Sequence, residues 1–321
     1  MIKIIFMSNG LFAVPTLKYL VNNKNIKINY IITSKKKYIN NKPNLIKRIS
    51  IDNNIKVIYS ENIDSQIYIN KIINSKPDFL IVISFKILKE IIWRIPKYGT
   101  INIHPSLLPQ YKGSSPINWS IINGDKITGL TSFFINNYID SGKIILQKII
   151  NIKKNTNFIK LRNELSNHTI NFLIRTLKKV LKYKKNRKEI NFKNIIKFKK
   201  IKLAPKINNY NSKIYFFLYS EKEILQLILG VPENKPAWCF LNTKEKIYII
   251  NIYKINIDLN INFENNPKYQ LGKLLYINKR IFIKTKNNYI ELLICQLNNK
   301  NKLNILDIYN GIKFKKDIFL F

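Results

Sequence analysis

The sequence predicts two domains: an α/β domain built on a mostly parallel sheet, followed by a small β-barrel. Over residues 1–150, apolar β-branched segments alternate with segments that repeat apolar residues at helical spacing, which is typical of strands wrapped by helices. Beyond Pro205, short strand patterns follow one another at regular spacing. The chain has 321 residues, of which 46% are hydrophobic, so it can bury a core in each domain.

The first domain begins with an apolar strand and a turn. Residues 2–6 form the strand, and Ser8-Asn9-Gly10 turns the chain. A helix follows over residues 12–21, where Pro15 is compatible only with a first turn. Further strands are predicted over residues 28–32, 78–83, 100–103, 131–135 and 144–149. This alternation predicts a Rossmann-like domain, in which sites gather at the carboxyl ends of the strands.

A long helix and a basic linker lead to the second domain. The helix is predicted over residues 156–182 and contains His168, for which we expect no chemical role. Residues 183–206 are rich in Lys and Asn and are interpreted as a linker between domains over residues 1–182 and 207–321. The second domain starts with a short helix over residues 221–229. Its strands are predicted over residues 237–241, 246–252, 270–277, 281–285 and 289–293, which favours an OB-like barrel.

The chain is strongly basic, with 56 Lys and Arg against 18 Asp and Glu and a formal net charge of +38. Such a charge attracts polyanions, most simply nucleic acid. The alternative source is A/T-rich codon usage, because Lys, Asn and Ile are all abundant and the lysines are spread along the whole chain. Either source leaves a positive field that draws RNA to the protein.

The sequence lacks the marks of a secreted, membrane-spanning or metal-binding protein. Residues 1–7 are predicted as a strand and lack the length and cleavage pattern of a signal peptide. Apolar runs such as residues 79–83 are far shorter than the roughly 20 residues that cross a bilayer. Cys239 and Cys295 are too few and too far apart for a disulfide framework or a zinc site. We therefore expect a monomeric cytoplasmic protein without membrane contact or metal ion.

One segment combines polar groups suited to catalysis with the end of a predicted strand. Residues 102–113 read Asn-Ile-His-Pro-Ser-Leu-Leu-Pro-Gln-Tyr-Lys-Gly and hold one of only two histidines in the chain. Asp140 follows in a Gly-bearing turn. An Asn, a His and an Asp at one strand end can polarise a carbonyl and move a proton. Each also has a structural alternative, since Asn102 and His104 can simply end a strand and Asp140 can serve as a turn residue.

These residues resemble the 10-formyltetrahydrofolate-dependent formyltransferases, and within them the branch that formylates methionyl-tRNA. The most specific match runs from Asn102 to Gly113 and continues through Pro116-Ile117-Asn118-Trp119 and Ile139-Asp140-Ser141-Gly142. The resemblance covers nearly the whole chain. Weaker matches lie at residues 12–15, 85–99, 204–206, 236–238, 290–293 and 310–311.

The resemblance implies roles for the residues of the central segment. Asn102 and His104 are expected to donate hydrogen bonds to a developing oxyanion, and Asp140 to pass protons through ordered water. The implied formyl donor is 10-formyltetrahydrofolate, with no metal. Several of the implied folate contacts are apolar and have a plain alternative as loop or core residues. The expected folate contacts are Ser106, Leu107, Leu108, Pro109, Phe85 and Leu88.

The implied acceptor is initiator methionyl-tRNA, which translation initiation requires in formylated form. The family places a tRNA-contacting loop where this chain has residues 34–47, and the second domain offers another basic surface. The loop of the family is rich in Gly and Arg, whereas residues 34–47 contain no Gly and form a slightly shorter segment. A solvated loop is the alternative. The expected tRNA contacts are Lys35, Lys36, Lys37, Lys42 and Lys206.

Two other hypotheses remain at this level. Glycinamide ribonucleotide formyltransferase shares the run from Asn102 to Pro109, and amino-sugar nucleotide formyltransferases share the region from Pro116 to Trp119, so a small amine is an alternative acceptor. The second domain counts against the purine enzyme. A degenerate chain that only binds RNA is the other alternative, against which the intact set of Asn102, His104 and Asp140 counts.

Overall fold

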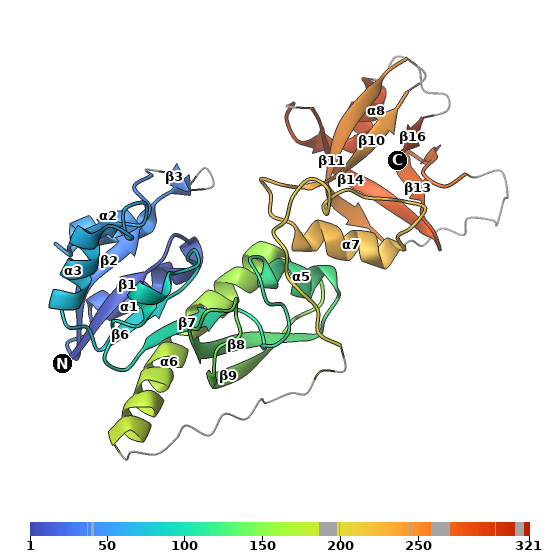
Figure 1. Cartoon of the computed structure of the whole chain (residues 1–321). Helices are drawn as coiled ribbons and strands as arrows, with labels where there is room; N and C mark the ends of the chain where they lie inside the picture. Colours follow the sequence, from blue (N-terminus) through green and yellow to red (C-terminus); the bar gives the residue numbers. More distant parts are fainter. Residues whose placement is uncertain are drawn as a thin grey trace. The chain divides into compact units, whose positions relative to one another are not determined.

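The structure is a computed structural model that describes residues 1–36, 38, 39, 42–185, 198, 200–243, 245–257, 270–298, 300–311 and 318–321. The chain forms two compact units (Figure 1). The first unit comprises Met1–Ile117, Lys126–Ile152 and Ile159–Pro205. The second comprises Asn118–Asp125, Lys153–Phe158 and Lys206–Phe321. Two short pieces of the predicted first domain therefore group with the C-terminal part of the chain.

The first unit is built on a seven-stranded sheet with the order β5-β2-β1-β6-β7-β8-β9. All neighbours from β5 to β7 are parallel, whereas β8 and β9 join antiparallel at one edge. The mostly parallel sheet is therefore confirmed. Its strands are β1 (Ile2–Met7), β2 (Ile26–Thr33), β5 (Val57–Tyr59), β6 (Phe79–Val82), β7 (Thr100–His104), β8 (Ile127–Phe134) and β9 (Ile144–Asn151).

Helices cover the sheet, because its central strands are apolar on both faces. Along β1 the side chains alternate, so that Ile5 and Met7 join a cluster with Ile72 and Ile92 of the covering helices. Long α6 (Phe158–Lys185) is tied to β8 through Thr176, whose hydroxyl donates to Ser132. The other elements are the 3-10 helix η1 (Leu11–Ala13), α1 (Val14–Val21), α2 (Leu45–Asp52), α3 (Gln66–Asn74), α4 (Glu90–Trp93), α5 (Pro116–Ile122), and the short strands β3 (Tyr38–Ile39) and β4 (Lys42–Pro43).

The strand order of this sheet reverses between β1 and β6. In α/β sheets, ligand sites lie outside the carboxyl ends of the strands at such a point. The Asn9 N–H donates to the Ser84 carbonyl at 3.1 Å, which joins the segments that follow β1 and β6. Val82 pairs with Asn102, so the end of β7 lies beside the end of β6. The chain segments after β1, β6 and β7 therefore lie together at the carboxyl ends of these strands.

The second unit contains an antiparallel sheet with the order β12-β13-β14-β11-β10-β16, with β15 beside β14. The Leu274 N–H donates to the Ile318 carbonyl at 2.9 Å, and the Leu320 N–H to the Gly272 carbonyl at 2.8 Å. These bonds join the two edge strands and close the sheet into a barrel. Its elements are α7 (Glu221–Gly230), β10 (Ala237–Asn242), β11 (Ile247–Asn256), β12 (Leu274–Ile277), β13 (Arg280–Lys284), β14 (Tyr289–Leu297), β15 (Leu303–Asn304), α8 (Ile305–Asn310) and β16 (Phe319–Leu320).

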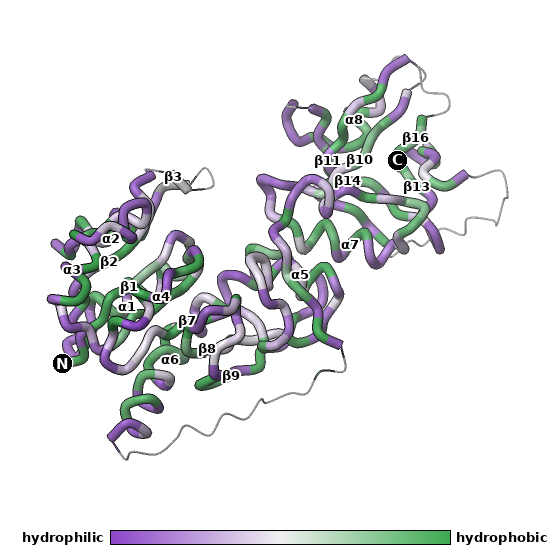
Figure 2. Tube along the Cα trace, in the orientation of Figure 1, coloured by the Kyte–Doolittle hydropathy of each residue, from purple (hydrophilic) through white to green (hydrophobic). Residues whose placement is uncertain are grey.

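Both cysteines lie in the core of the barrel. Cys239 and Cys295 are fully buried, and burial raises the pKa of both thiols. Such thiols stay protonated and act as small apolar side chains. Figure 2 shows that apolar stretches lie along both the helices and the strands of each unit. Among the described residues, no helix combines the length and the apolar composition needed to span a membrane.

Several boundaries differ from those predicted by the sequence. Helix α6 begins two positions later than predicted and runs to Lys185, into the predicted linker. Most of that linker lies outside the described residues, but residues 200–205 are described and group with the first unit. Strand β8 begins at Ile127, four residues before the predicted start, because Thr128 and Gly129 interrupt the apolar pattern.

Candidate active site

Strand β7 positions two of the three predicted catalytic residues. Its side chains alternate between the two faces of the sheet, so Asn102 and His104 project from the same face. The strand is held on both sides, by β6 and by β8, where Asn102 pairs with Phe133. His104 is only 5% exposed, and Asn102 is partly buried. The backbone below both side chains is therefore rigid.

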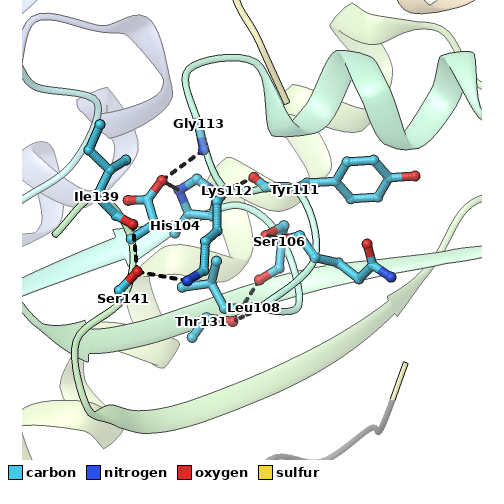
Figure 3. Close-up of polar contacts among 11 residues, drawn as sticks. His104, Ser106, Leu108, Tyr111, Lys112, Gly113, Thr131, Ile139 and Ser141 are labelled. Atoms are coloured by element: carbon cyan, nitrogen blue, oxygen red, sulfur yellow. Dashed lines mark hydrogen bonds and ion pairs between the residues drawn. The ribbon is translucent and has the colours of Figure 1, made fainter. Parts of the chain in front are cut away.

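The His104 ring lies between a backbone carbonyl and a carboxylate (Figure 3). Its Nε2 is 2.8 Å from the Tyr111 carbonyl oxygen, and its Nδ1 is 3.7 Å from Oδ2 of Asp140. Because a carbonyl only accepts, the bond to Tyr111 requires a proton on Nε2. A second proton, on Nδ1, would point at the Asp140 carboxylate. Both ring nitrogens of His104 therefore face hydrogen-bond acceptors.

Asp140 reaches His104 from a tight turn between β8 and β9. Its backbone is in the left-handed region at φ 47°, and its side chain is 12% exposed. The Gly113 N–H donates to Oδ2 at 2.9 Å, which fixes the carboxylate next to the ring. The structure thus brings His104 and Asp140 together. The Asn102 amide makes no hydrogen bond to any described residue, which leaves its N–H groups available to a substrate.

Residues 106–109, which are predicted to contact the folate, are anchored to β8 by hydrogen bonds to Thr131. The Thr131 hydroxyl donates to the Ser106 carbonyl at 2.7 Å and accepts from the Leu108 N–H at 3.1 Å. Leu107 and Leu108 are buried, at 4% and 2% exposure. A cis peptide bond joins Leu108 to Pro109, which is partly exposed. The leucine side chains therefore hold the loop in place, and Pro109 presents its surface.

The other predicted folate contacts belong to the segment that follows β6. Leu88 is buried in the cluster of apolar residues under this edge of the sheet, and Phe85 packs against the same cluster. Ile87, between them, is 76% exposed. Ile87 is therefore the most exposed of the three side chains, whereas the predicted contact Leu88 is buried and the predicted contact Phe85 is partly buried.

The basic loop after β2 is anchored at its base. The Asn44 amide donates to the Ser34 carbonyl at 3.0 Å, and its oxygen caps α2 by accepting from the Lys47 N–H. Glu61 accepts from the Ser34 hydroxyl at 2.6 Å and from the Lys35 N–H. Burial alone would raise the pKa of Glu61, but these bonds and one from Ser60 outweigh it and lower the pKa to about 2. Neither anchor was predicted from the sequence, although an Asn before a helix is an N-cap signal.

The predicted tRNA contacts are only partly described. Lys35 and Lys36 are exposed at the start of the basic loop. Lys37 lies outside the described residues, and for Lys42 only the backbone, in β4, is described. Lys206 is exposed at the start of the C-terminal stretch of the second unit. In the described part of the chain, no three His, Cys, Asp or Glu side chains gather in a group able to hold a metal ion.

The fold and the site together define a formyl transferase. Residues 2–177 match the model of the formyl transferase family and residues 206–313 that of the formyl transferase C-terminal domain, so the chain belongs to this family. It is 34% identical to the methionyl-tRNA formyltransferase of Flavobacterium johnsoniae over 98% of both chains. It is 30% identical to the methionyl-tRNA formyltransferase of Clostridium tetani over 100% of both chains.

A solved structure shares the fold. The N-formyltransferase of Helicobacter canadensis, in complex with folinic acid and dTDP-3-aminofucose, has a TM-score of 0.60. It is 20% identical and covers 93% of this chain and 100% of its own. The order of an α/β sheet and an antiparallel C-terminal domain thus recurs in formyltransferases of known structure.

Proposed function

We propose that this protein transfers a formyl group from 10-formyltetrahydrofolate to the α-amino group of methionine on initiator methionyl-tRNA. The observation that carries the proposal is the pairing of His104 and Asp140 beside the amide of Asn102. Full-length relatives named methionyl-tRNA formyltransferase support the acceptor. We assign formyl transfer to residues 1–182, and contact with the tRNA to the basic loop and residues 207–321.

The chain has groups for each demand of the reaction. The donor supplies the formyl group as an amide on its N10 nitrogen. The Asn102 amide donates to the formyl oxygen as negative charge develops on it, and positive charge on the His104 ring stabilises the same oxygen. Asp140, through ordered water, takes up the proton that the attacking amine loses and returns one to the departing nitrogen. The exposed apolar surface of Ile87, at this edge of the sheet, fits a flat heteroaromatic donor.

The charge of the chain fits an acceptor that carries many phosphates. Lys35 and Lys36 extend from a loop whose base is held by Asn44 and Glu61. A loop anchored in this way presents its lysines at a defined place, so less side-chain freedom is lost when phosphates bind. With a formal net charge of +38, long-range attraction also speeds the encounter with tRNA.

A small amine on a nucleotide sugar is the second candidate acceptor. The observation that favours it is the shared fold with the Helicobacter canadensis enzyme, whose structure contains dTDP-3-aminofucose. At 20% identity this likeness extends to the fold alone. The charge and the full-length relatives favour the tRNA.

A comparison of acceptors tests the proposal. Purified protein with 10-formyltetrahydrofolate is given methionyl-tRNA, glycinamide ribonucleotide or dTDP-3-aminofucose, and the formylated product is measured. We expect formylated product to form rapidly with methionyl-tRNA and not with either small amine. A double variant, Lys35→Ala with Lys36→Ala, should raise KM for the tRNA and leave KM for the donor unchanged. The matched control, Lys3→Ala with Lys27→Ala, removes two exposed charges near the amino ends of β1 and β2, whereas the basic loop follows the carboxyl end of β2. Preferential formylation of either small amine would overturn the proposed acceptor.

A further inference from the structure

A short loop connects the two catalytic side chains. The Tyr111 carbonyl accepts from His104 at 2.8 Å, and two residues later the Gly113 N–H donates to Asp140 at 2.9 Å. Any shift of this loop therefore moves His104 and Asp140 relative to each other. The 3.7 Å between the His104 Nδ1 and the Asp140 carboxylate depends on the conformation of residues 111–113.

The other side of this loop is bound by residues 200–204, which we call the strap. The Tyr111 N–H donates to the Lys202 carbonyl at 2.7 Å, and the Ala204 N–H donates to the Lys112 carbonyl at 2.8 Å. The Ala204 carbonyl in turn accepts from the Ser115 N–H at 3.1 Å. Lys112 and Leu203 pair as in a parallel ladder. Tyr111 is thus held by the strap through its N–H and holds His104 through its carbonyl.

The strap packs closely against the rest of the first unit. Ala204 is completely buried, although the sequence analysis assigned it to a linker. Its carbonyl lies so close to Gly113 that a Cβ there would come within 2.5 Å of the oxygen, and Gly113 adopts φ +126°. Only a glycine satisfies both conditions. This glycine also supplies the N–H that holds Asp140.

One buried side chain clamps the strap to the loop. Gln110 is 7% exposed, and both ends of its amide are used. Its Nε2 donates to the Lys200 carbonyl at 2.5 Å, and its Oε1 accepts from the Lys202 N–H at 2.7 Å. The Gln110 carbonyl accepts from the Ser106 hydroxyl at 2.6 Å, which ties the same residue to the anchored segment below the site. Removing this amide removes both of these bonds to the strap.

We propose that Gln110 is a positioning residue for the proposed formyl transfer. It holds the strap, the strap holds the backbone of residues 111–113, and this backbone keeps His104 facing Asp140. The inference rests on the proposed function, because its rate measurement is formyl transfer to methionyl-tRNA. Gln110 touches neither His104 nor Asp140, so its effect passes through the strap and the loop.

The first test separates positioning from binding. Gln110→Met keeps the length of the side chain and loses both amide bonds, and Gln110→Asn is a milder variant that keeps the groups at a shorter reach. We expect kcat to fall by about ten- to a hundredfold in Gln110→Met, because a shift of catalytic groups on the order of 1 Å has this effect. KM for donor and tRNA should not change. The control, Asn29→Leu, loses an amide bond to the Ser75 carbonyl in the same unit. An unchanged kcat in both Gln110 variants, or an equal loss in the control, overturns the proposal.

The second test asks whether Gln110 acts through His104. In a double-mutant cycle, Gln110→Met is combined with His104→Ala, and single-turnover rates are measured at high enzyme concentration. If Gln110 only positions His104, the double variant has the rate of His104→Ala alone. A full further loss in the double variant overturns the proposal.

The third test needs no substrate. The chain has only two histidines, so their ring resonances are readily assigned by NMR. In Gln110→Asn and Gln110→Met the resonance of His104 should shift, and that of His168 should stay in place. If the wild-type protein transfers no formyl group but its variants show this shift, the proposed function is wrong and the positioning role of Gln110 stands. If the protein formylates methionyl-tRNA but the His104 resonance does not shift in the variants, the positioning role is wrong and the proposed function stands.

Discussion

The two histidines of the chain lie in the same unit, and their surroundings carry opposite charges. The His104 Nδ1 lies 3.7 Å from the carboxylate of Asp140. The His168 Nδ1, on α6, lies 2.9 Å from the ammonium nitrogen of Lys148 on β9. Because an ammonium only donates, His168 must accept through an unprotonated Nδ1. Both nitrogens of the His104 ring therefore face acceptors, whereas Nδ1 of the His168 ring faces a donor.

The difference shows that an imidazole acquires its chemistry from its neighbours. Burial and then the charge of Lys148 lower the pKa of His168, and Glu164 offsets only part of this effect. A ring of this kind is mostly neutral at pH 7, and its Nδ1 lone pair already accepts from Lys148, so that nitrogen is not free to take up a proton. His104 has a carboxylate and a carbonyl to receive its two N–H groups. With both N–H groups engaged in this way, the ring has none left for an oxyanion, so the proposed mechanism assigns the hydrogen bond to the Asn102 amide and the proton transfers to Asp140 and water.

Removing the charge of Asp140 tests the comparison most severely. In Asp140→Asn the amide oxygen can still accept from Gly113, so the fold should persist. We expect kcat to fall by about 10²- to 10⁴-fold, because the proton path and the charge next to His104 are lost. The control is Asp52→Asn, which removes a surface carboxylate paired with Arg48. Steady-state turnover and thermal unfolding are measured for both, and near-normal turnover in Asp140→Asn contradicts the proposed roles.

The Asn102 amide accounts for the next largest effect. Asn102→Leu keeps a similar side-chain volume and removes the amide that is proposed to donate to the formyl oxygen. We expect a loss of about 10²- to 10³-fold in kcat, the range for one donor to an oxyanion. Asn22→Leu is the control, since Asn22 only donates to the Lys18 carbonyl on the surface of α1. If kcat of Asn102→Leu equals that of the control, the oxyanion role of Asn102 is wrong.

Changing the neighbour of His168 should alter its titration and not the reaction. In Lys148→Met the ammonium is gone, so the pKa of His168 should rise. An NMR titration of the two histidines follows the change directly. The kcat should remain that of the wild type, because His168 has no part in the proposed mechanism. A large loss of kcat would show that the two sites are coupled.

The smallest expected effect concerns stability in mild acid. The pKa of His168 in the folded state lies below the 6.5 of the unfolded chain. Below pH 6.5 the unfolded chain therefore binds more protons, and the free energy of unfolding decreases as the pH falls towards the folded-state pKa. His168→Gln should lose less stability than the wild type over that interval. Denaturant unfolding at pH values on either side of 6.5 measures the difference, and parallel losses contradict the assignment.

The sequence could predict most of the sheet because strand patterns are local. Runs such as residues 4–7 and 79–82 are apolar on both faces, so no other part of the chain was needed to recognise the strands that contain them. Helices α2 and α3 were missed because Asn, Lys and Ser interrupt their apolar residues. Strands β10 to β14 of the barrel were predicted from their local patterns, whereas the short β15 and β16 were not. The bonds that close the barrel could not be predicted, because they join segments far apart in sequence.

The residues of the candidate site could be named from the sequence, whereas the contacts that support them could not. Asn102, His104 and Asp140 could be named from their pattern, but no periodicity shows that Asp140 returns to His104. The strap was concealed by its composition, because residues 200–204 continue a Lys-rich segment that is typical of a linker. The buried position of Ala204, the amide bonds of Gln110 and the backbone bonds to residues 111–115 show that this segment belongs to the first unit.

The most direct test of the account compares His104→Ala with His168→Ala in single-turnover formyl transfer from 10-formyltetrahydrofolate to methionyl-tRNA. Both variants remove an imidazole from the same unit, so they differ only in the neighbours that the ring loses. The account predicts that His104→Ala reduces the rate by about 10³-fold or more, whereas His168→Ala transfers the formyl group at the wild-type rate. Similar rates in the two variants would contradict it.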